Sequence, residues 1–287
     1  MKHIRDVLAS VYQTDELHSI SRLLISKITG FSFTEILVNK NTIISEQQRE
    51  FLNIYLEKLK CRMPVQYVLG ETEFCGLNFQ VDETVLIPRP ETEELVAWIV
   101  QEAKPKSTVL DVGTGSGCIA ISLKNFLPDS DMHACDNDEG ALATACRNAE
   151  MTAQKVNFFK MDMLHDSASD RKYHIIVSNP PYIPMQEEAE ILPQVKHFEP
   201  HQALFVPDDD PLIFYRKIAI FASQHLYDDG KLFFEVHRKF GTACVEMLQK
   251  MGFANVQLKK DIFANDRMIQ AEKPGENNNE ISAYSPN

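Results

Sequence analysis

The glycine-rich turn within residues 108–117 constrains the fold most, because a strand pattern enters it and a helix pattern leaves it. The segment is Thr-Val-Leu-Asp-Val-Gly-Thr-Gly-Ser-Gly, and apolar residues then recur with helical spacing from Ile119. Such a turn places backbone N–H groups and the positive end of a helix dipole at the C-terminal edge of a sheet. The glycine spacing lacks the third glycine of the dinucleotide-binding pattern, and no Gly-Lys-Ser/Thr of a P-loop follows. The sequence therefore predicts an α/β sheet with a ligand at this edge.

Acidic residues follow two later strand patterns. The predicted strands after the turn are residues 132–135, 156–159, 174–178, 231–236, 256–258 and 268–270. Because the C-terminal ends of parallel strands meet at one edge of a sheet, Asp136 is expected to take both ribose hydroxyls of a nucleoside. Asp162 is expected to accept a hydrogen bond from an adenine N6 amine, with Met163 packed on the ring. The structural alternatives are a helix N-cap at Asp136, a tight turn at the glycines and a solvated loop acid at Asp162.

The fourth predicted strand leads into Asn179-Pro180-Pro181-Tyr182, a turn rich in hydrogen-bond acceptors. Prolines donate no N–H and have a fixed φ, so the carbonyls of Asn179 and Pro180 stay free to accept, and the Asn179 side chain adds a further oxygen. Acceptors backed by an aromatic ring suit a planar NH2 group, such as a carboxamide or an exocyclic base amine. An ordinary Asn-Pro turn that ends a strand is the alternative.

These patterns give a set of candidate site residues. The predicted catalytic residues are Asn179, Pro180 and Tyr182, and the predicted substrate-binding residues are Asn179, Pro180, Pro181, Tyr182 and Arg89. Arg89 is included because it lies between two prolines, which favours a fixed hydrogen-bonding role. The predicted cofactor-binding residues are Asp111, Gly113, Thr114, Gly115, Ser116, Gly117, Asp136, Asp162, Met163 and Asn179. A nucleoside-binding sheet that has no phosphate-binding lysine and carries this turn fits S-adenosylmethionine as cofactor and methyl transfer to a planar nitrogen.

Composition excludes several other classes of protein. The net charge is −12, and no lysine or arginine cluster forms a stripe that would neutralise phosphates. Six cysteines form no C-x-x-C pair, which argues against a zinc site or a disulfide framework. The N-terminus lacks the apolar region of a signal peptide, and no apolar run approaches the length of a membrane span. We therefore expect a cytoplasmic protein with no metal, no membrane partner and no direct contact with nucleic acid.

The chain divides into segments of different character. Residues 1–69 are predicted to be helical, with one apolar face at Leu17, Ile20, Leu24 and Ile28, and a second helix opened by a capping box at Ser45 and Gln48. This second helix carries an apolar face of Phe51, Leu52, Tyr55, Leu56 and Leu59. Residues 1–85 hold nine lysines and arginines against eleven aspartates and glutamates. Docking of a macromolecular partner is the functional interpretation of the helical segment, and a structural cap is the alternative.

The remaining boundaries are also set by composition. Residues 70–85 are predicted to be a β-hairpin linker, 86–272 the sheet domain, and 273–287 a disordered tail. Residues 183–209 form a long polar connection without clear periodicity, a type of loop that is usually functional. Asp210 and Pro211 are expected to be the N-cap and first residue of a helix bearing Phe214.

Two motifs, residues 111–117 and 179–182, resemble the class I amino methyltransferases that modify glutamine amides or the amino groups of adenine and cytosine. The segments 64–70, 86–93 and 198–200 with Ala203 and Leu204 resemble more narrowly the peptide chain release factor N5-glutamine methyltransferases (HemK/PrmC family). The resemblance implies a Rossmann-like, seven-stranded mixed sheet of the class I S-adenosylmethionine-dependent methyltransferases, with a small all-α N-terminal domain and a β-hairpin linker. It also implies methylation of the glutamine in the Gly-Gly-Gln motif of peptide chain release factors, and we expect a monomer.

The expected mechanism is in-line displacement, in which the Asn179 side-chain oxygen and the Pro180 carbonyl accept the two amide hydrogens and Tyr182 stacks on the amide. Two other functions remain open. An N6-adenine or N4-cytosine nucleic-acid methyltransferase would use the same turn on a flipped base. A catalytically silent adaptor would keep the fold for binding alone.

Overall fold

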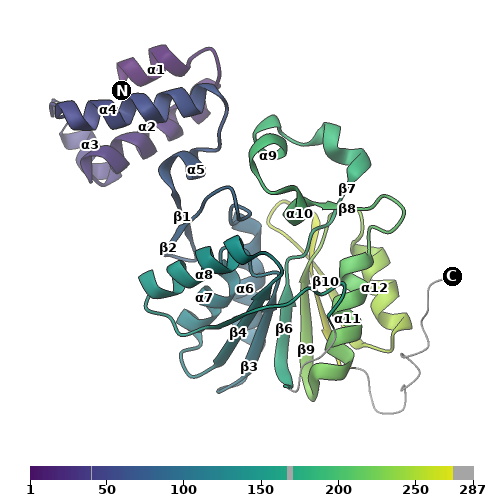
Figure 1. Ribbon diagram of the computed structural model, residues 1–287. Coiled ribbons are helices and arrows are strands. Elements are labelled where there is room, and N and C mark those ends of the chain that lie inside the picture. The colour runs from purple at the N-terminus through teal and green to yellow at the C-terminus, as the bar shows by residue number, and fades with distance from the viewer. Residues whose placement is uncertain (40, 167–170, 274–287) are drawn as a thin grey trace. The chain divides into compact units, whose positions relative to one another are not determined.

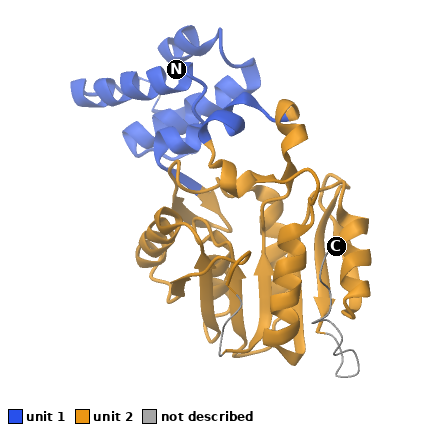
Figure 2. Ribbon diagram, turned by 45° about the vertical axis from the view of Figure 1, so that its right-hand side comes forward, with its two compact units in different colours: residues 1–72, 191–198 blue, residues 73–190, 199–287 orange. Residues whose placement is uncertain are grey.

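A computed structural model describes residues 1–39, 41–166 and 171–273 (Figure 1). The chain forms two compact units (Figure 2). The helical unit comprises Met1–Thr72 and Ile191–Phe198, and the sheet unit comprises Glu73–Glu190 and Glu199–Asn287. Residues 274–287 of the predicted disordered tail lie outside the described residues. The predicted functional division at residues 69, 85 and 272 stays a prediction.

The helical unit buries one apolar face of each of its longer helices. Its helices are α1 (Lys2–Leu8), α2 (Thr14–Thr29), α3 (Phe33–Val38), α4 (Glu46–Lys60), α5 (Val65–Leu69) and α9 (Pro193–Phe198). The predicted capping box begins α4, because Ser45 Oγ accepts from the Gln48 N–H at 3.2 Å and Gln48 Oε1 accepts from the Ser45 N–H at 2.8 Å. Phe51 was wrongly placed on the buried face, since 47% of it is exposed while Leu52, Leu56 and Leu59 are buried.

A β-hairpin follows, formed by β1 (Glu71–Phe74) and β2 (Leu77–Gln80). Its two turn residues, Cys75 and Gly76, have φ values of 50° and 74°. Positive φ at both central positions is typical of a type I′ turn, whose twist matches that of paired strands. The predicted hairpin is confirmed, and its role as a linker stays a prediction.

The sheet unit is built on seven strands in the order β10-β11-β9-β6-β3-β4-β5. The strands are β3 (Thr108–Val112), β4 (Asp131–Asp136), β5 (Asn157–Lys160), β6 (Tyr173–Ser178), β9 (Leu226–Glu235), β10 (Ala254–Lys260) and β11 (Asp266–Glu272). The five strands from β9 to β5 pair in parallel, whereas β11 pairs antiparallel with β9 and β10. The predicted seven-stranded mixed sheet is confirmed.

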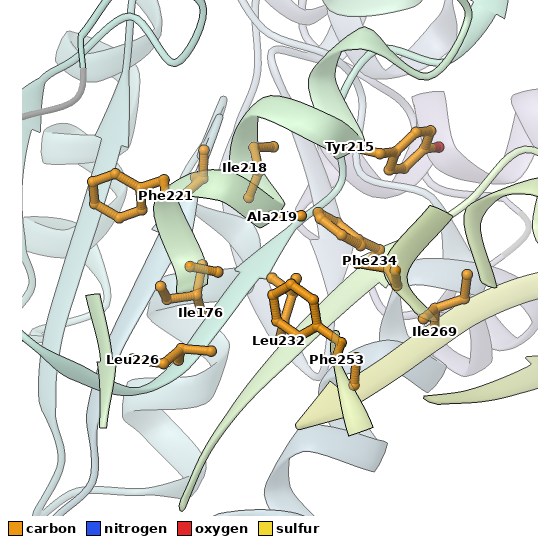
Figure 3. Close-up of a cluster of buried hydrophobic side chains, with 14 of the residues drawn as sticks. Ile176, Tyr215, Ile218, Ala219, Phe221, Leu226, Leu232, Phe234, Phe253 and Ile269 are labelled. Carbon is orange, nitrogen blue, oxygen red and sulfur yellow. The ribbon is translucent and has the colours of Figure 1, made fainter. Parts of the chain in front are cut away.

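Helices cover both faces of this sheet (Figure 1). The helices of the sheet unit are α6 (Pro90–Glu102), α7 (Cys118–Phe126), α8 (Glu139–Met151), α10 (His201–Leu204), α11 (Ile213–His225) and α12 (Gly241–Lys250). Successive residues of a strand point to opposite faces, so Ile175 packs in the cluster with α6 and α7, while Ile176 packs in the cluster with α11 and α12. Figure 3 shows Ile176, Leu232 and Phe234 of the second cluster beside side chains of α11.

The connection from residue 183 contains more structure than its sequence indicates. It holds β7 (Ile183–Pro184), a short 3₁₀ helix η1 (Met185–Glu190), α9, α10 and β8 (Phe205–Val206), and β7 pairs with β8. These elements are two to six residues long, too short to show a period.

The expected start of the next helix was wrong. Helix α11 begins at Ile213 with Leu212 as N-cap. The Asp210 carboxylate instead accepts two hydrogen bonds from the guanidinium of Arg216, at 2.7 and 2.9 Å. Asp210 is thus tied to Arg216, the fourth residue of α11.

Candidate active site

A cavity opens at the C-terminal edge of the parallel strands, within the sheet unit. Its volume is about 1060 Å³ with the solvent space at its mouth included. The predicted site residues that line it are Arg89, Gly113, Thr114, Gly115, Ser116, Asp136, Asp162, Met163, Asn179, Pro180 and Pro181. Three predicted residues, Asp111, Gly117 and Tyr182, are not part of its wall.

The glycines of the turn have different environments. Gly113 and Gly115 have φ values of 71° and 55°, and no heavy atom lies within 4 Å of the position that a Cβ would take. These positions leave open space beside the main chain, as a ligand that approaches it requires. A Cβ on Gly117 would instead lie 2.9 Å from Ile121 Cδ1 and 3.1 Å from Ala145 Cβ. Gly117 therefore allows the turn to pack closely against α7 and α8.

Asp111 lies inside the protein and holds the turn from within. Its carboxylate is fully buried, and Oδ2 accepts from Thr114 Oγ1 at 2.7 Å and from the Ala120 N–H at 3.3 Å. Among the described residues, Oδ1 has no hydrogen-bond partner. Burial raises the pKa of Asp111 to about 7. Asp111 thus holds the glycine turn and the first turn of α7 together, and it does not line the cavity.

Asp136 stands at the edge of the cavity as the last residue of β4. Its Oδ2 accepts from the Gly115 N–H at 2.9 Å, and its Oδ1 accepts from the Asp138 N–H at 3.0 Å. Burial raises the pKa of Asp136, and these backbone hydrogen bonds oppose that effect. Each carboxylate oxygen can accept a second hydrogen bond, so two hydroxyls can bind here. The helix N-cap of α8 is Asp138, which removes the capping alternative for Asp136.

Asp162 and Met163 lie after β5 and both line the cavity. Asp162 Oδ1 accepts from the Leu164 N–H, and Oδ2 lies 2.9 Å from His165 Nδ1. The hydrogen bond from His165 lowers the pKa of Asp162. Met163 is 8% exposed. The acid is therefore fixed by its own loop beside an apolar wall.

The Asn179 turn is tied to the glycine turn through Ser178, whose Oγ donates to the Val112 carbonyl at 2.7 Å. Asn179, Pro180 and Pro181 line the cavity. Tyr182 does not line it: its hydroxyl donates to Glu235 Oε1 at 3.3 Å, and burial raises its pKa.

Arg89 is held by an ion pair at the cavity wall. Its Nη2 lies 2.6 and 2.7 Å from the two oxygens of Glu199, which also accepts from the Ile87 N–H at 3.3 Å. Glu199 is 3% exposed. This pair joins residues 86–93 to residues 198–200.

Sequence reasoning missed several polar residues of this region. They are Thr92, Asp138, Glu199, Gln202 and Glu235. Thr92 and Glu235 are 143 positions apart in the chain, so no local pattern joins them. An acid at the end of an apolar strand run is the signal that singled out Asp136, and it also applies to Glu235.

Two absences concern the described part of the chain alone. No group of three or more His, Cys, Asp or Glu side chains there is placed to hold a metal ion. No helix in those ranges has the length and apolar character needed to cross a membrane.

Two family models match the chain. A model described as the PrmC N-terminal domain matches residues 1–70, and one described as the methyltransferase small domain matches residues 91–196. Relatives include the release factor glutamine methyltransferase of Flavobacterium psychrophilum, 42% identical over 92% of this chain and 94% of that protein. The release factor glutamine methyltransferase of Bacteroides thetaiotaomicron is also 42% identical, over 94% of this chain and 98% of that protein. The fold is similar to the crystal structure of a methyltransferase from Pyrococcus furiosus, with a TM-score of 0.52 and 19% identity, covering 70% of this chain and 90% of that one.

Proposed function

The chain belongs to the release factor glutamine methyltransferase family, and we propose that it methylates the glutamine of the Gly-Gly-Gln motif of peptide chain release factors with S-adenosylmethionine. Its sheet is that of the class I methyltransferases, as predicted. The observation that carries the proposal is that the Asn179-Pro180-Pro181 turn borders the same cavity as the glycine turn and Asp136. One cavity thus offers a nucleoside-type site and a group of acceptors for an NH2 group.

The residues of the cavity fit the proposed cofactor. Gly113 and Gly115 leave the main chain open, and Asp136 has acceptor capacity left for two ribose hydroxyls. Asp162 and Met163 supply an acceptor and an apolar surface for an adenine. S-adenosylmethionine supplies a sulfonium methyl group that is already activated for displacement. In this proposal Asp111 and Gly117 act indirectly, because they hold the glycine turn.

The chain's own task is to orient a poor nucleophile and to remove its water. The Asn179 side-chain oxygen and the Pro180 carbonyl accept the two hydrogens of the glutamine amide. This localises the nitrogen lone pair toward the methyl carbon, so that a C–N bond forms as the C–S bond breaks. The amide proton becomes acidic upon transfer and leaves to a carbonyl or to water, so no strong base is needed. Arg89 and Pro181 contribute to the substrate side of the wall.

The expected stacking of Tyr182 on the substrate amide stays a prediction. Its hydroxyl donates to Glu235 Oε1, and Tyr182 is not among the residues that line the cavity. In the proposed complex, the substrate amide contacts the face of the Tyr182 ring while the Tyr182 hydroxyl stays bound to Glu235.

We also propose that residues 1–69 dock the protein substrate. Large apolar side chains are exposed on this segment, among them Phe33, Leu37, Val38, Ile43 and Ile54. Leu37 and Val38 are neighbours in α3, and exposed apolar side chains that lie together mark interaction sites. A cytoplasmic location, a monomeric state and the absence of direct nucleic-acid contact complete the proposal.

The test is methyl transfer from labelled S-adenosylmethionine to a purified release factor. The matched control is the same factor with the Gly-Gly-Gln glutamine changed to alanine. Label in the first alone supports the proposal. Label that appears instead in DNA or RNA would overturn the substrate and would favour the nucleic-acid methyltransferase, while no transfer to any of them with intact cofactor binding would favour the adaptor.

A further inference from the structure

Thr92 and Glu235 form a buried hydrogen bond that reaches the side chain of Asn179. Thr92 lies in the first turn of α6, and Glu235 is the last residue of β9. Thr92 Oγ1 is 2.6 Å from Glu235 Oε2, and the two residues are 2% and 1% exposed. Asn179 Nδ2 is 3.4 Å from the same Thr92 oxygen. The three side chains thus form a chain from the interior to the cavity wall.

Glu235 accepts two hydrogen bonds inside the protein, although burial raises its pKa. Burial raises the pKa of Glu235 and Glu91 adds to this, whereas Thr92, Arg267 and Tyr182 oppose it. Two hydroxyl groups, those of Thr92 and Tyr182, donate to its two oxygens. Hydrogen bonds donated to a carboxylate favour the ionised state. Glu235 is therefore an acceptor on both sides.

The number of hydrogens on each group fixes the direction of both hydrogen bonds from Glu235 to Asn179. A threonine hydroxyl has one hydrogen and an oxygen with two lone pairs. The Thr92 hydroxyl donates its one hydrogen to Glu235 Oε2. The Thr92 oxygen can then only accept from Asn179, so the NH2 end of the Asn179 amide faces Thr92. The oxygen of that amide is left to accept from a group in the cavity.

We propose that Thr92 and Glu235 are positioning residues for methyl transfer, which fix the Asn179 amide so that its oxygen faces the substrate NH2 group. This inference rests on the proposed function. Without the hydrogen bonds from Glu235 and Thr92, the Asn179 amide can rotate by half a turn. It then presents its own NH2 group, which repels the hydrogens of the substrate. Tyr182 is bound to the other oxygen of the same carboxylate, so Glu235 fixes both polar side chains of the turn.

Variants of Thr92 and Glu235 separate positioning from a purely structural role. Thr92→Val keeps the shape and removes the hydroxyl, Thr92→Ser keeps the hydroxyl, and Glu235→Met keeps the length and removes the acceptor. The matched control is Thr144→Val, because Thr144 is also a fully buried threonine, lies near the carboxylate of Asp82 and is not part of the cavity wall. Turnover of a release factor, the dissociation constant of S-adenosylmethionine and the melting temperature are measured for each full-length variant.

We expect Thr92→Val and Glu235→Met each to lower kcat on the order of 10²-fold, the scale of a misplaced reacting group. The cofactor dissociation constant should change by less than about twofold, and Thr92→Ser should recover most of the turnover, because a hydroxyl suffices. The double variant should have about the same kcat as the less active of the two single variants, because Thr92 and Glu235 both act through Asn179. Independent structural effects would multiply to roughly 10⁴-fold, and this result would overturn the proposal. A fully active Thr92→Val would also overturn it.

A second measurement needs no methyl acceptor. The side-chain NH2 resonance of Asn179 is assigned by its loss in Asn179→Ala and followed in the isotope-labelled protein. The proposal requires that this resonance moves in Thr92→Val and keeps its position in Thr144→Val. An unchanged resonance in Thr92→Val would overturn the proposal. If release factors are not methylated while the resonance moves, the proposed substrate has failed and the positioning chain stands.

Discussion

The carboxylate of Asp136 accepts a 2.9 Å hydrogen bond from the backbone N–H of Gly115, so the end of one strand fixes the turn that follows the neighbouring strand. Residues 111 and 136 lie on the paired strands β3 and β4, and the register sets Val112 opposite Cys135. The acid and the turn therefore meet because the strands are parallel and adjacent. The ligand-binding edge is thus organised by backbone pairing as well as by side chains.

Asp136→Ala should weaken the binding of S-adenosylmethionine. The variant loses both the acceptor for ribose hydroxyls and the anchor of Gly115. Hydrogen bonds to a charged group contribute about 1.5–3 kcal/mol, so the dissociation constant should rise by about 10- to 100-fold, as measured by calorimetry. Asp131→Ala is the control, because Asp131 is an exposed acid at the opposite end of the same strand. An unchanged dissociation constant in Asp136→Ala would refute the assignment.

Gly115→Ala and Gly117→Ala should fail in different ways. Both add strain of about 1–2 kcal/mol, because both positions have positive φ. At Gly117 the new methyl also meets Ile121 and Ala145, so the free energy of unfolding should fall further, by about 1–3 kcal/mol. At Gly115 the methyl enters open space, so the larger effect should be on cofactor affinity. Denaturant unfolding and a cofactor titration check both, and equal unfolding free energies of the two variants would contradict the account.

Much of the fold follows from local patterns. Ile175 and Ile176 belong to an apolar run that predicts a strand buried on both faces, and the glycine turn predicts its sheet edge. The capping box at Ser45 and Gln48 marks a helix start because both partners lie within four residues. Phe51 and Asp210 were misplaced because burial and capping depend on neighbours that the local pattern does not contain.

The candidate site was predictable where a local pattern marks it, as at the glycine turn and where a strand ends in a polar residue. Asp136, Asp162 and Asn179 were found in this way, and they line one cavity. The distant residues that hold the site residues in place were not predicted. Glu199 pairs with Arg89 across 110 positions, and its position follows only from the folded chain. Asp111 belongs to the glycine motif by sequence, and only burial shows that it lies behind the turn.

The stability of the cofactor-free protein should depend on pH through Asp111. The pKa of this carboxyl is about 7 in the folded protein against 3.8 for an ordinary aspartate, so the folded state keeps a proton that the unfolded chain has lost. The stabilisation is fully present below about pH 4 and is lost as pH rises to about 7, with a slope of at most about 1.4 kcal/mol per pH unit. In Asp111→Asn this contribution disappears. Denaturant unfolding between these pH values should therefore give a flatter profile for the variant, and identical profiles would refute the prediction.

Charge placed on the exposed apolar side chains of α3 should weaken docking alone. Leu37 and Val38 are 61% and 78% exposed, so Leu37→Glu with Val38→Glu should leave the fold intact. The KM for the release factor should rise about tenfold or more if these side chains bury against the substrate, while the cofactor dissociation constant stays unchanged. Phe126→Glu, an exposed apolar residue of the sheet unit, is the control. An unchanged KM would remove these two residues from the docking surface.

The most direct test of the account is the turnover of Asn179→Ala on a release factor, measured together with its affinity for S-adenosylmethionine. The account predicts that turnover falls on the order of 10²- to 10³-fold or more, as when a group aimed at the reacting atoms is removed. The cofactor dissociation constant should stay within a few-fold of that of the unmodified protein, because Asp136 and the glycine turn are intact. Turnover close to that of the unmodified protein, with the same glutamine methylated, would contradict the assignment of Asn179 as the residue that holds the amide.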